Sequence, residues 1–199
     1  MAGRDNKREA RARFLLGNLL AEIYSNECAA DLLGEAVAID PGLVEAHVAL
    51  GFVLGRDEDF IGMVEAFREA VSRDVAAARA AAIWEPDEME QLWGVLRPGV
   101  IRSAPHRAPS PLGMDAELRE AGRLTRLAGE HVGAGRDAEA VTALGSALRL
   151  DPRSMFAVAL LVLTCLLMQA GGGAADALAD AEGVLREMEP GLAELLFES

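Results

Sequence analysis

Aromatic residues are scarce in this chain and make up only 5% of its 199 positions. Strands are built mainly from aromatic and β-branched side chains, whereas Ala, Leu, Glu and Arg, which are abundant here, favour helices. This shortage argues against a sheet-based core, and the composition predicts an all-α protein. Because 51% of the residues are apolar, a chain of this length can bury a sizeable hydrophobic core.

Cysteine and histidine are also rare. Cys28 and Cys165 lie far apart in apolar helical stretches without a CxxC pair, so we expect both to be buried structural thiols. The three histidines, His47, His106 and His131, lack the spacing of metal ligands. We therefore expect no metal site, and because no nucleophile is paired with a base, we expect no catalytic residues.

One short motif could suggest a cofactor. Residues 133–135 read Gly-Ala-Gly, which is similar to the start of a dinucleotide-binding fingerprint. That fingerprint follows a strand, whereas these residues follow a predicted helix. We interpret them as a hairpin turn and expect no cofactor.

Positively charged residues are outnumbered in this chain. It has 19 Lys and Arg residues and 32 Asp and Glu residues, and its net charge is −13. Such a surface repels nucleic acids and anionic membranes, so neither is expected as a partner. A neutral, basic or apolar partner fits better. Residues 1–13 are rich in charge and have no signal-peptide cleavage site, which predicts a cytoplasmic location.

What the sequence does contain is an internal repeat. Shifting the chain by 34 residues places similar residues on two helical faces in register. The matched pairs are Leu16 with Leu50, Gly17 with Gly51, Leu20 with Leu54, Leu33 with Phe67, Ala36 with Ala70, Val37 with Val71 and Asp40 with Asp74. The register returns at Leu127, Ala128, His131, Ala140, Leu144, Ala147, Leu148, Asp151 and Pro152. Each copy predicts two helices joined by a short turn.

Small and acidic residues recur at fixed positions in each copy, where they predict how the helices pack and how they are capped. Glycine or alanine after the leucine of the first helix lets the second helix approach closely, as at Gly17 and Gly51. The aspartate of the closing Asp-Pro pair can cap the next helix through its side-chain oxygen, as at Asp40 and Asp151.

In these features the chain resembles the tetratricopeptide-repeat (TPR) family, whose unit is a 34-residue helical hairpin. Residues 10–43, 44–77 and 121–154 match that unit well, and residues 155–188 match it more weakly. The resemblance covers about two-thirds of the chain and implies a TPR-like solenoid of about four hairpins, with one degenerate, inserted region.

Composition divides the chain into two halves. Residues 1–97 hold two repeats and a degenerate hairpin, and residues 114–199 hold two repeats and a short C-terminal cap. Between them, residues 98–113 contain prolines at 98, 105, 109 and 111, which predicts an extended, mildly basic connector.

The resemblance also implies where a partner would bind. Family members hold a peptide or a helix in the concave groove lined by their first helices. The corresponding residues here include Phe14, Asn18, Val48, Phe52 and Arg126. Members that bind chaperone C-termini use a clamp of Lys, Asn and Arg around a carboxylate. Only Asn18 and Arg126 match that clamp, which makes chaperone C-termini an unlikely class of partner.

Residues 155–170 form a run of sixteen residues without a charge. By the repeat register, Phe156, Leu160, Leu163 and Leu167 line the groove or lie open. Such a helix must be covered, and three covers remain open: a partner or second copy in the groove, the C-terminal elements of the chain, or a membrane. A membrane is disfavoured because about 20 apolar residues are needed to cross it.

The sequence therefore predicts a protein-binding scaffold or adaptor that holds a peptide, a helix or a second copy of itself. Two alternatives share the same repeat chemistry. One is a secretion-type chaperone that cradles apolar segments of exported proteins, and the other is a membrane-associated assembly factor.

The connector generates a first testable prediction. Limited proteolysis of the native protein should cut first after Arg102 or Arg107, because a proline-rich segment has few backbone hydrogen bonds to protect it. Mass spectrometry of the early fragments identifies the cut. Resistance at both arginines would mean that residues 98–113 are packed against the helices.

Overall fold

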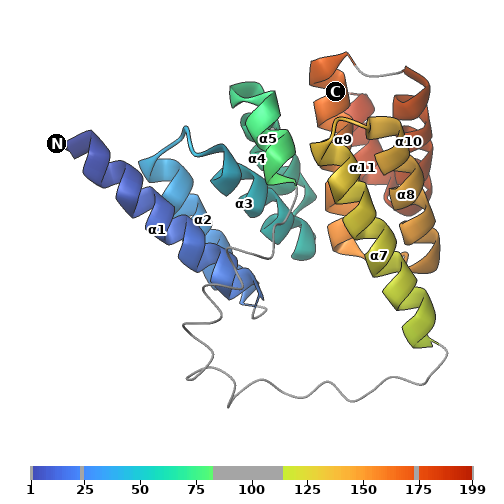
Figure 1. Cartoon of the computed structure of the whole chain (residues 1–199), viewed down its shortest axis with the longest axis horizontal. Helices are drawn as coiled ribbons and strands as arrows, with labels where there is room; N and C mark the ends of the chain where they lie inside the picture. The colour runs from blue at the N-terminus through green and yellow to red at the C-terminus, as the bar shows by residue number, and fades with distance from the viewer. Residues whose placement is uncertain (1, 23–24, 83–113, 173–174, 199) are drawn as a thin grey trace.

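The computed structural model describes residues 2–22, 25–82, 114–172 and 175–198, and the regular structure in these residues is helical (Figure 1). The predicted all-α class is confirmed. The helices of the first half are α1 (Ala2–Glu22), α2 (Asn26–Ile39), α3 (Val44–Arg56), α4 (Phe60–Arg73) and α5 (Val75–Ala81). Those of the second half are α7 (Met114–Gly133), α8 (Asp137–Leu150), α9 (Met155–Gly171), α10 (Ala175–Met188) and α11 (Pro190–Phe197).

Helices that follow one another in the chain pack as hairpins, most extensively α1 with α2, α3 with α4, and α7 with α8. The degenerate hairpin predicted before residue 97 begins with α5, and its remainder lies outside the described residues. The connector at 98–113 also lies outside them.

The repeat places glycine where two helices come closest. A Cβ atom added to Gly17 would lie 2.8 Å from Cγ of Leu33, and one added to Gly51 would lie 2.3 Å from Cε1 of Phe67. Both distances are shorter than any normal carbon contact. The predicted close approach therefore exists in both hairpins, between residues that correspond under the 34-residue shift.

The closing aspartates act in two ways. Asp74 accepts a hydrogen bond from the backbone N–H of Ala77 and so caps α5. Asp40 and Asp151 instead accept from the N–H two residues ahead, in the turn, because α3 and α9 begin later in the chain. The expected side-chain cap of the next helix is therefore wrong for these two aspartates.

Helix α9 occupies the centre of the fold. It packs against α3 and α4 of the first half and against α8 and α10 of the second. Every residue from Ala157 to Met168 is buried. Of the three covers proposed for residues 155–170, the C-terminal elements of the chain supply part, through α10. Another part comes from α3 and α4 of the first half, which the sequence did not predict.

Three residues assigned to the groove are therefore in the core. Leu160 is 1% exposed, and Leu163 and Leu167 are fully buried. Their placement on an open groove was wrong, because the repeat register assumes that each hairpin contacts only its neighbours in sequence. No helix in the described ranges is long and apolar enough to cross a membrane.

An ion pair also links the two halves. The Arg79 guanidinium on α5 makes two hydrogen bonds to the Asp137 carboxylate at the start of α8 and donates a third, of 2.9 Å, to the Val132 carbonyl. Both charged side chains are largely buried. On another face, Arg68 of α4 donates to the Leu195 carbonyl of α11 over 3.2 Å.

Burial of α9 gives a stability prediction. Leu163→Ala should lower the free energy of unfolding by about 2–5 kcal/mol, the range for leucine truncation in a packed core. Leu163→Asp should prevent folding, because an unpaired charge is too costly to bury. Urea denaturation followed by circular dichroism measures both changes.

Leu118→Ala is the matched control, since Leu118 is 41% exposed and its truncation should change stability by no more than about 0.5 kcal/mol. A folded Leu163→Asp protein of normal stability would place this leucine on the surface and contradict the packing of α9.

Candidate functional site

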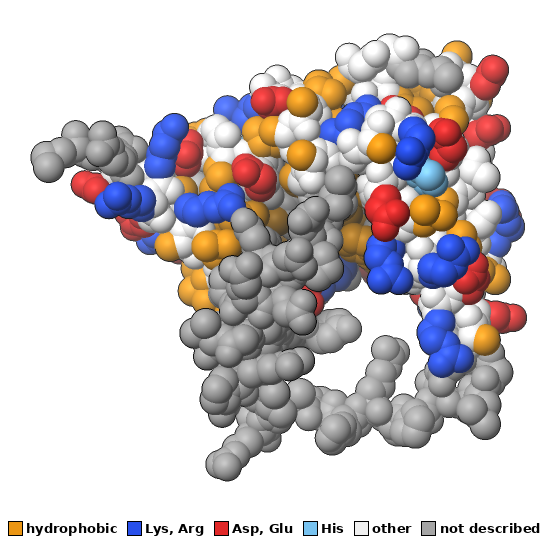
Figure 2. All heavy atoms as spheres, viewed as in Figure 1, with side chains coloured by type: hydrophobic (Ala, Val, Ile, Leu, Met, Phe, Trp, Pro, Cys, Tyr) orange, Lys and Arg blue, Asp and Glu red, His pale blue; other side chains and the backbone are white. Residues whose placement is uncertain are grey.

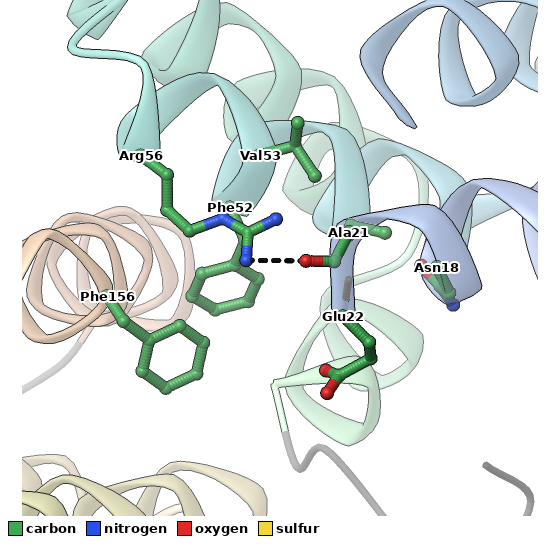
Figure 3. A pocket seen from close by; sticks show the side chains of 8 residues that line it. Asn18, Ala21, Glu22, Phe52, Val53, Arg56 and Phe156 are labelled. Atoms are coloured by element: carbon green, nitrogen blue, oxygen red, sulfur yellow. Dashed lines mark hydrogen bonds between the residues drawn. The ribbon is translucent and has the colours of Figure 1, made fainter. Parts of the chain in front are cut away.

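A pocket of about 270 Å³ lies where α1, α3 and α9 meet (Figure 3). Its lining comes from the C-terminal half of α1, the middle and end of α3, and the first turn of α9. The lining residues are Asn18, Ala21, Glu22, Ala49, Phe52, Val53, Arg56 and Phe156. The pocket therefore depends on α9 packing back against the first half of the chain.

Two phenylalanines form its aromatic wall. The rings of Phe52 and Phe156 stack with their centroids 4.8 Å apart and their planes 25° apart. Phe52 also meets the edge of Phe67, whose ring centroid lies 5.3 Å away. These contacts hold Phe52 in the core, while Phe156, at the start of α9, stays partly exposed. The wall offers an apolar surface with little freedom to move.

Polar groups of both charges line the same pocket. Arg56 Nη1 donates a 2.9 Å hydrogen bond to the Ala21 carbonyl, which ties the end of α3 to the end of α1 (Figure 3). Arg56 Nη2 and Asn18 Oδ1 are buried without a hydrogen-bond partner among the described residues. Glu22 is exposed. Buried polar atoms are nearly always paired, so these two atoms are a departure from ordinary packing beside the pocket.

Three of the predicted groove residues meet here, namely Asn18, Phe52 and Phe156. The other three predicted residues of the first helices are elsewhere. Phe14 is buried under the Arg11 guanidinium, 4.9 Å from its ring centroid, and Val48 is 1% exposed in the core. Arg126 lies exposed on α7 and does not line the pocket.

Sequence reasoning missed Arg56 and Glu22. Both lie four residues after a predicted groove residue, Phe52 and Asn18 respectively, so each is on the same helix face one turn later. That spacing was the available signal. The 34-residue repeat pattern did not draw attention to this spacing, because both residues stand at the ends of first helices, next to the turns.

The cysteines and His47 offer no reactive group at this site. Burial raises the pKa of the Cys165 thiol to about 12, which keeps it protonated. Cys28 is exposed, so its predicted burial was wrong.

Desolvation lowers the pKa of His47, whose Nε2 hydrogen-bonds to the Pro41 carbonyl over 3.1 Å. Within the described residues, no group of three His, Cys, Asp or Glu side chains could hold a metal ion.

Comparisons of this chain with protein-family models, with curated proteins and with solved structures give no match.

The unpaired amide of Asn18 generates a prediction. Asn18→Leu should raise the free energy of unfolding by about 1–3 kcal/mol, because the mutation removes a buried acceptor that has no partner among the described residues. The midpoint of urea denaturation measures the change.

Thr164→Val is the control for removing a buried polar group. The Thr164 hydroxyl is also buried, but it donates a 2.7 Å hydrogen bond to the Leu160 carbonyl, so its loss should not stabilise the protein. If Asn18→Leu instead destabilises the chain, the Asn18 amide is satisfied in solution, for example by water.

Proposed function

We propose that this chain is a protein-interaction scaffold or adaptor that binds a segment of another polypeptide at the pocket between α1, α3 and α9. The observation that carries the proposal is the meeting of Asn18, Phe52 and Phe156. The resemblance to TPR proteins assigns Asn18 and Phe52 to a binding surface, the repeat register adds Phe156, and all three line one pocket. Their pocket has an aromatic wall and unpaired polar atoms, which suits recognition better than structural filling.

The resemblance to TPR proteins supports the same function. The corresponding glycine contacts, Gly17 with Leu33 and Gly51 with Phe67, are those expected of stacked 34-residue hairpins. A TPR-like arrangement of the hairpins remains part of this proposal. In that arrangement the first helices contribute the binding residues, and here α1 and α3 line the pocket.

Charge supports a neutral, basic or apolar partner. The chain carries a net charge of −13, and on the face in Figure 2 acidic and basic side chains are interspersed. A nucleic-acid partner would need many phosphate contacts from lysine or arginine, which this balance disfavours. We propose a protein partner, with no nucleic acid and no cofactor.

The secretion-type chaperone shares the repeat chemistry and would cradle apolar segments of exported proteins. The most apolar helix, α9, is covered by the chain's own helices, and no observation on the described residues favours that alternative over an adaptor. A second copy of the chain stays within the proposal as one form of partner.

The proposal is tested with the intact chain purified from its native source together with whatever is bound to it. A partner identified by mass spectrometry is then purified and titrated against the wild type and against Phe156→Ala by calorimetry. We expect a stoichiometric complex that Phe156→Ala weakens about tenfold or more, since aromatic residues at the centre of an interface contribute about 2 kcal/mol or more.

Two further measurements complete the design. Leu118→Ala, which truncates an exposed apolar residue on α7, should leave the affinity unchanged. Light scattering of the chain alone detects a second copy as the partner. If no stoichiometric partner and no self-association is found, or if Phe156→Ala binds as well as wild type, the proposed site is wrong.

A further inference from the structure

One face of α1 is apolar although this helix lies at one end of the fold (Figure 1). We call it the α1 outer face, and four residues at helical spacing make it up: Ala12, Leu15, Leu16 and Leu19. Leu16 is 47% exposed, Ala12 is also exposed, and Leu15 and Leu19 are half-buried. An apolar stripe of this kind is open to water at a cost unless something covers it.

The other sides of α1 already have neighbours. Gly17 lies against Leu33 of α2, and Arg11 forms an ion pair of 3.5 Å with Glu45 of α3. The exposure of Leu16 shows that neither of these helices covers the outer face.

The repeat register shows what the corresponding face does in other first helices. The 34-residue shift carries the α1 outer face onto Ala46, Ala49, Leu50 and Val53 of α3. On α3 this face packs into the apolar cluster that α3 shares with α1 and α2. On α9 the face is buried as well, and its residues are Ala157, Leu160, Leu161 and Thr164. In both helices an apolar face at this position is covered by other helices.

Helix α7 shows how the repeat treats this face when water covers it. The corresponding residues are Arg123, Arg126, Leu127 and Glu130, and the three charged ones are exposed. A polar outer face of this kind is what the open end of a helical repeat array needs for solubility. Of the four first helices α1, α3, α7 and α9, only α1 combines an apolar face with exposure. This contrast indicates that another molecule covers the α1 outer face.

A second copy of the chain supplies a matching surface. The large apolar side chains that are exposed in the described ranges are Leu16, Ile61 and Leu118, on three different helices. The described parts of α10 and α11 expose no large apolar side chain, so they offer α1 no apolar counterpart in a head-to-tail contact. A surface that pairs with its own copy closes on a two-fold axis and leaves no open end.

Charge favours the same pairing. Residues 5–22 contain four basic and three acidic side chains, whereas the whole chain carries a net charge of −13. Two copies can therefore meet at α1 without the repulsion that an excess of acidic groups causes elsewhere.

The charges on α1 also specify the direction of the pair. Arg8 and Glu22 are both exposed, one about a turn before Ala12 and the other about a turn after Leu19. In an antiparallel pair centred at Leu15 and Leu16, Arg8 of each copy lies next to Glu22 of the other, and small Ala12 lies opposite large Leu19. A parallel pair would instead place like charges together.

We propose that the α1 outer face binds the same face of a second copy of this chain, with the two α1 helices antiparallel. Leu15 and Leu16 lie at the two-fold axis, and Arg8 of each copy pairs with Glu22 of the other. The inference does not depend on the proposed function, because this surface and the pocket share only Glu22. The pair carries two copies of the pocket.

Analytical ultracentrifugation of the intact chain over a wide range of protein concentration tests the inference. We expect a monomer–dimer equilibrium whose mass approaches twice 21.1 kDa at high concentration. Leu16→Asp should raise the dissociation constant at least about tenfold, because it places a charge at the centre of the apolar surface in both copies. Ile61→Asp is the matched control, since Ile61 is 64% exposed on α4, and it should dimerise as wild type does.

Further variants test the direction and the location of the pair. Arg8→Glu and Glu22→Arg should each weaken dimerisation by bringing like charges together, and the double variant should restore it. Phe156→Ala, in the pocket, should leave dimerisation unchanged. Circular dichroism checks each fold, and Ala12→Glu replaces Leu16→Asp if that variant does not fold.

Four results overturn the inference. These are a wild-type chain that stays monomeric at every concentration, a dimer that Leu16→Asp leaves intact, a double charge variant that does not recover, and a dimer that Phe156→Ala disrupts. The last result would place the second copy at the pocket. The proposed function is tested separately, since a partner segment that Phe156→Ala loses and Leu16→Asp retains binds at the pocket whether or not the chain dimerises.

Discussion

The burial of α9 is the constraint on which the rest of the structure depends. Its 17 residues carry no charge, and nearly all of them must be shielded from water on every side. The second half of the chain covers one part of this surface with α8 and α10, and the first half covers another with α3 and α4. Neither half supplies the whole cover, so the chain folds as one body around α9.

The same helix explains why a pocket exists. Phe156 stands at the start of α9, where the helix emerges from the core, and its ring stacks on Phe52 of α3 in the pocket that α1 also lines. A ligand that touches Phe156, Asn18 and Arg56 would contact both halves at once. Binding of this kind stabilises the whole folded chain, because the unfolded chain has no such pocket.

Much of the local structure follows from the sequence. The 34-residue shift predicted that Gly17 and Gly51 let a second helix approach closely, and the short distances from an added Cβ to Leu33 and Phe67 confirm that approach. It did not predict the packing of α9, because periodicity identifies the faces of a helix but not the distant segments that cover them. The surface position of Cys28 was missed for a related reason, since apolar neighbours in sequence do not determine which face is covered.

The candidate site was predictable in part. Asn18, Phe52 and Phe156 were assigned from the repeat register, and their common pocket follows from a packing contact that the register does not contain. Leu160, Leu163 and Leu167 were misplaced by the assumption that only neighbouring hairpins touch. Arg56 and Glu22 take part through charge and hydrogen bonding, which an analysis of apolar periodicity does not detect.

The paired hydrogen bonds between Arg79 and Asp137 have a topological consequence. They join α5 of the first half to the start of α8 in the second, and α9 adds its contacts with α3 and α4. Contacts between side chains therefore hold the described parts of the two halves together. Two halves made as separate fragments would carry, in these contacts, the surfaces with which to assemble.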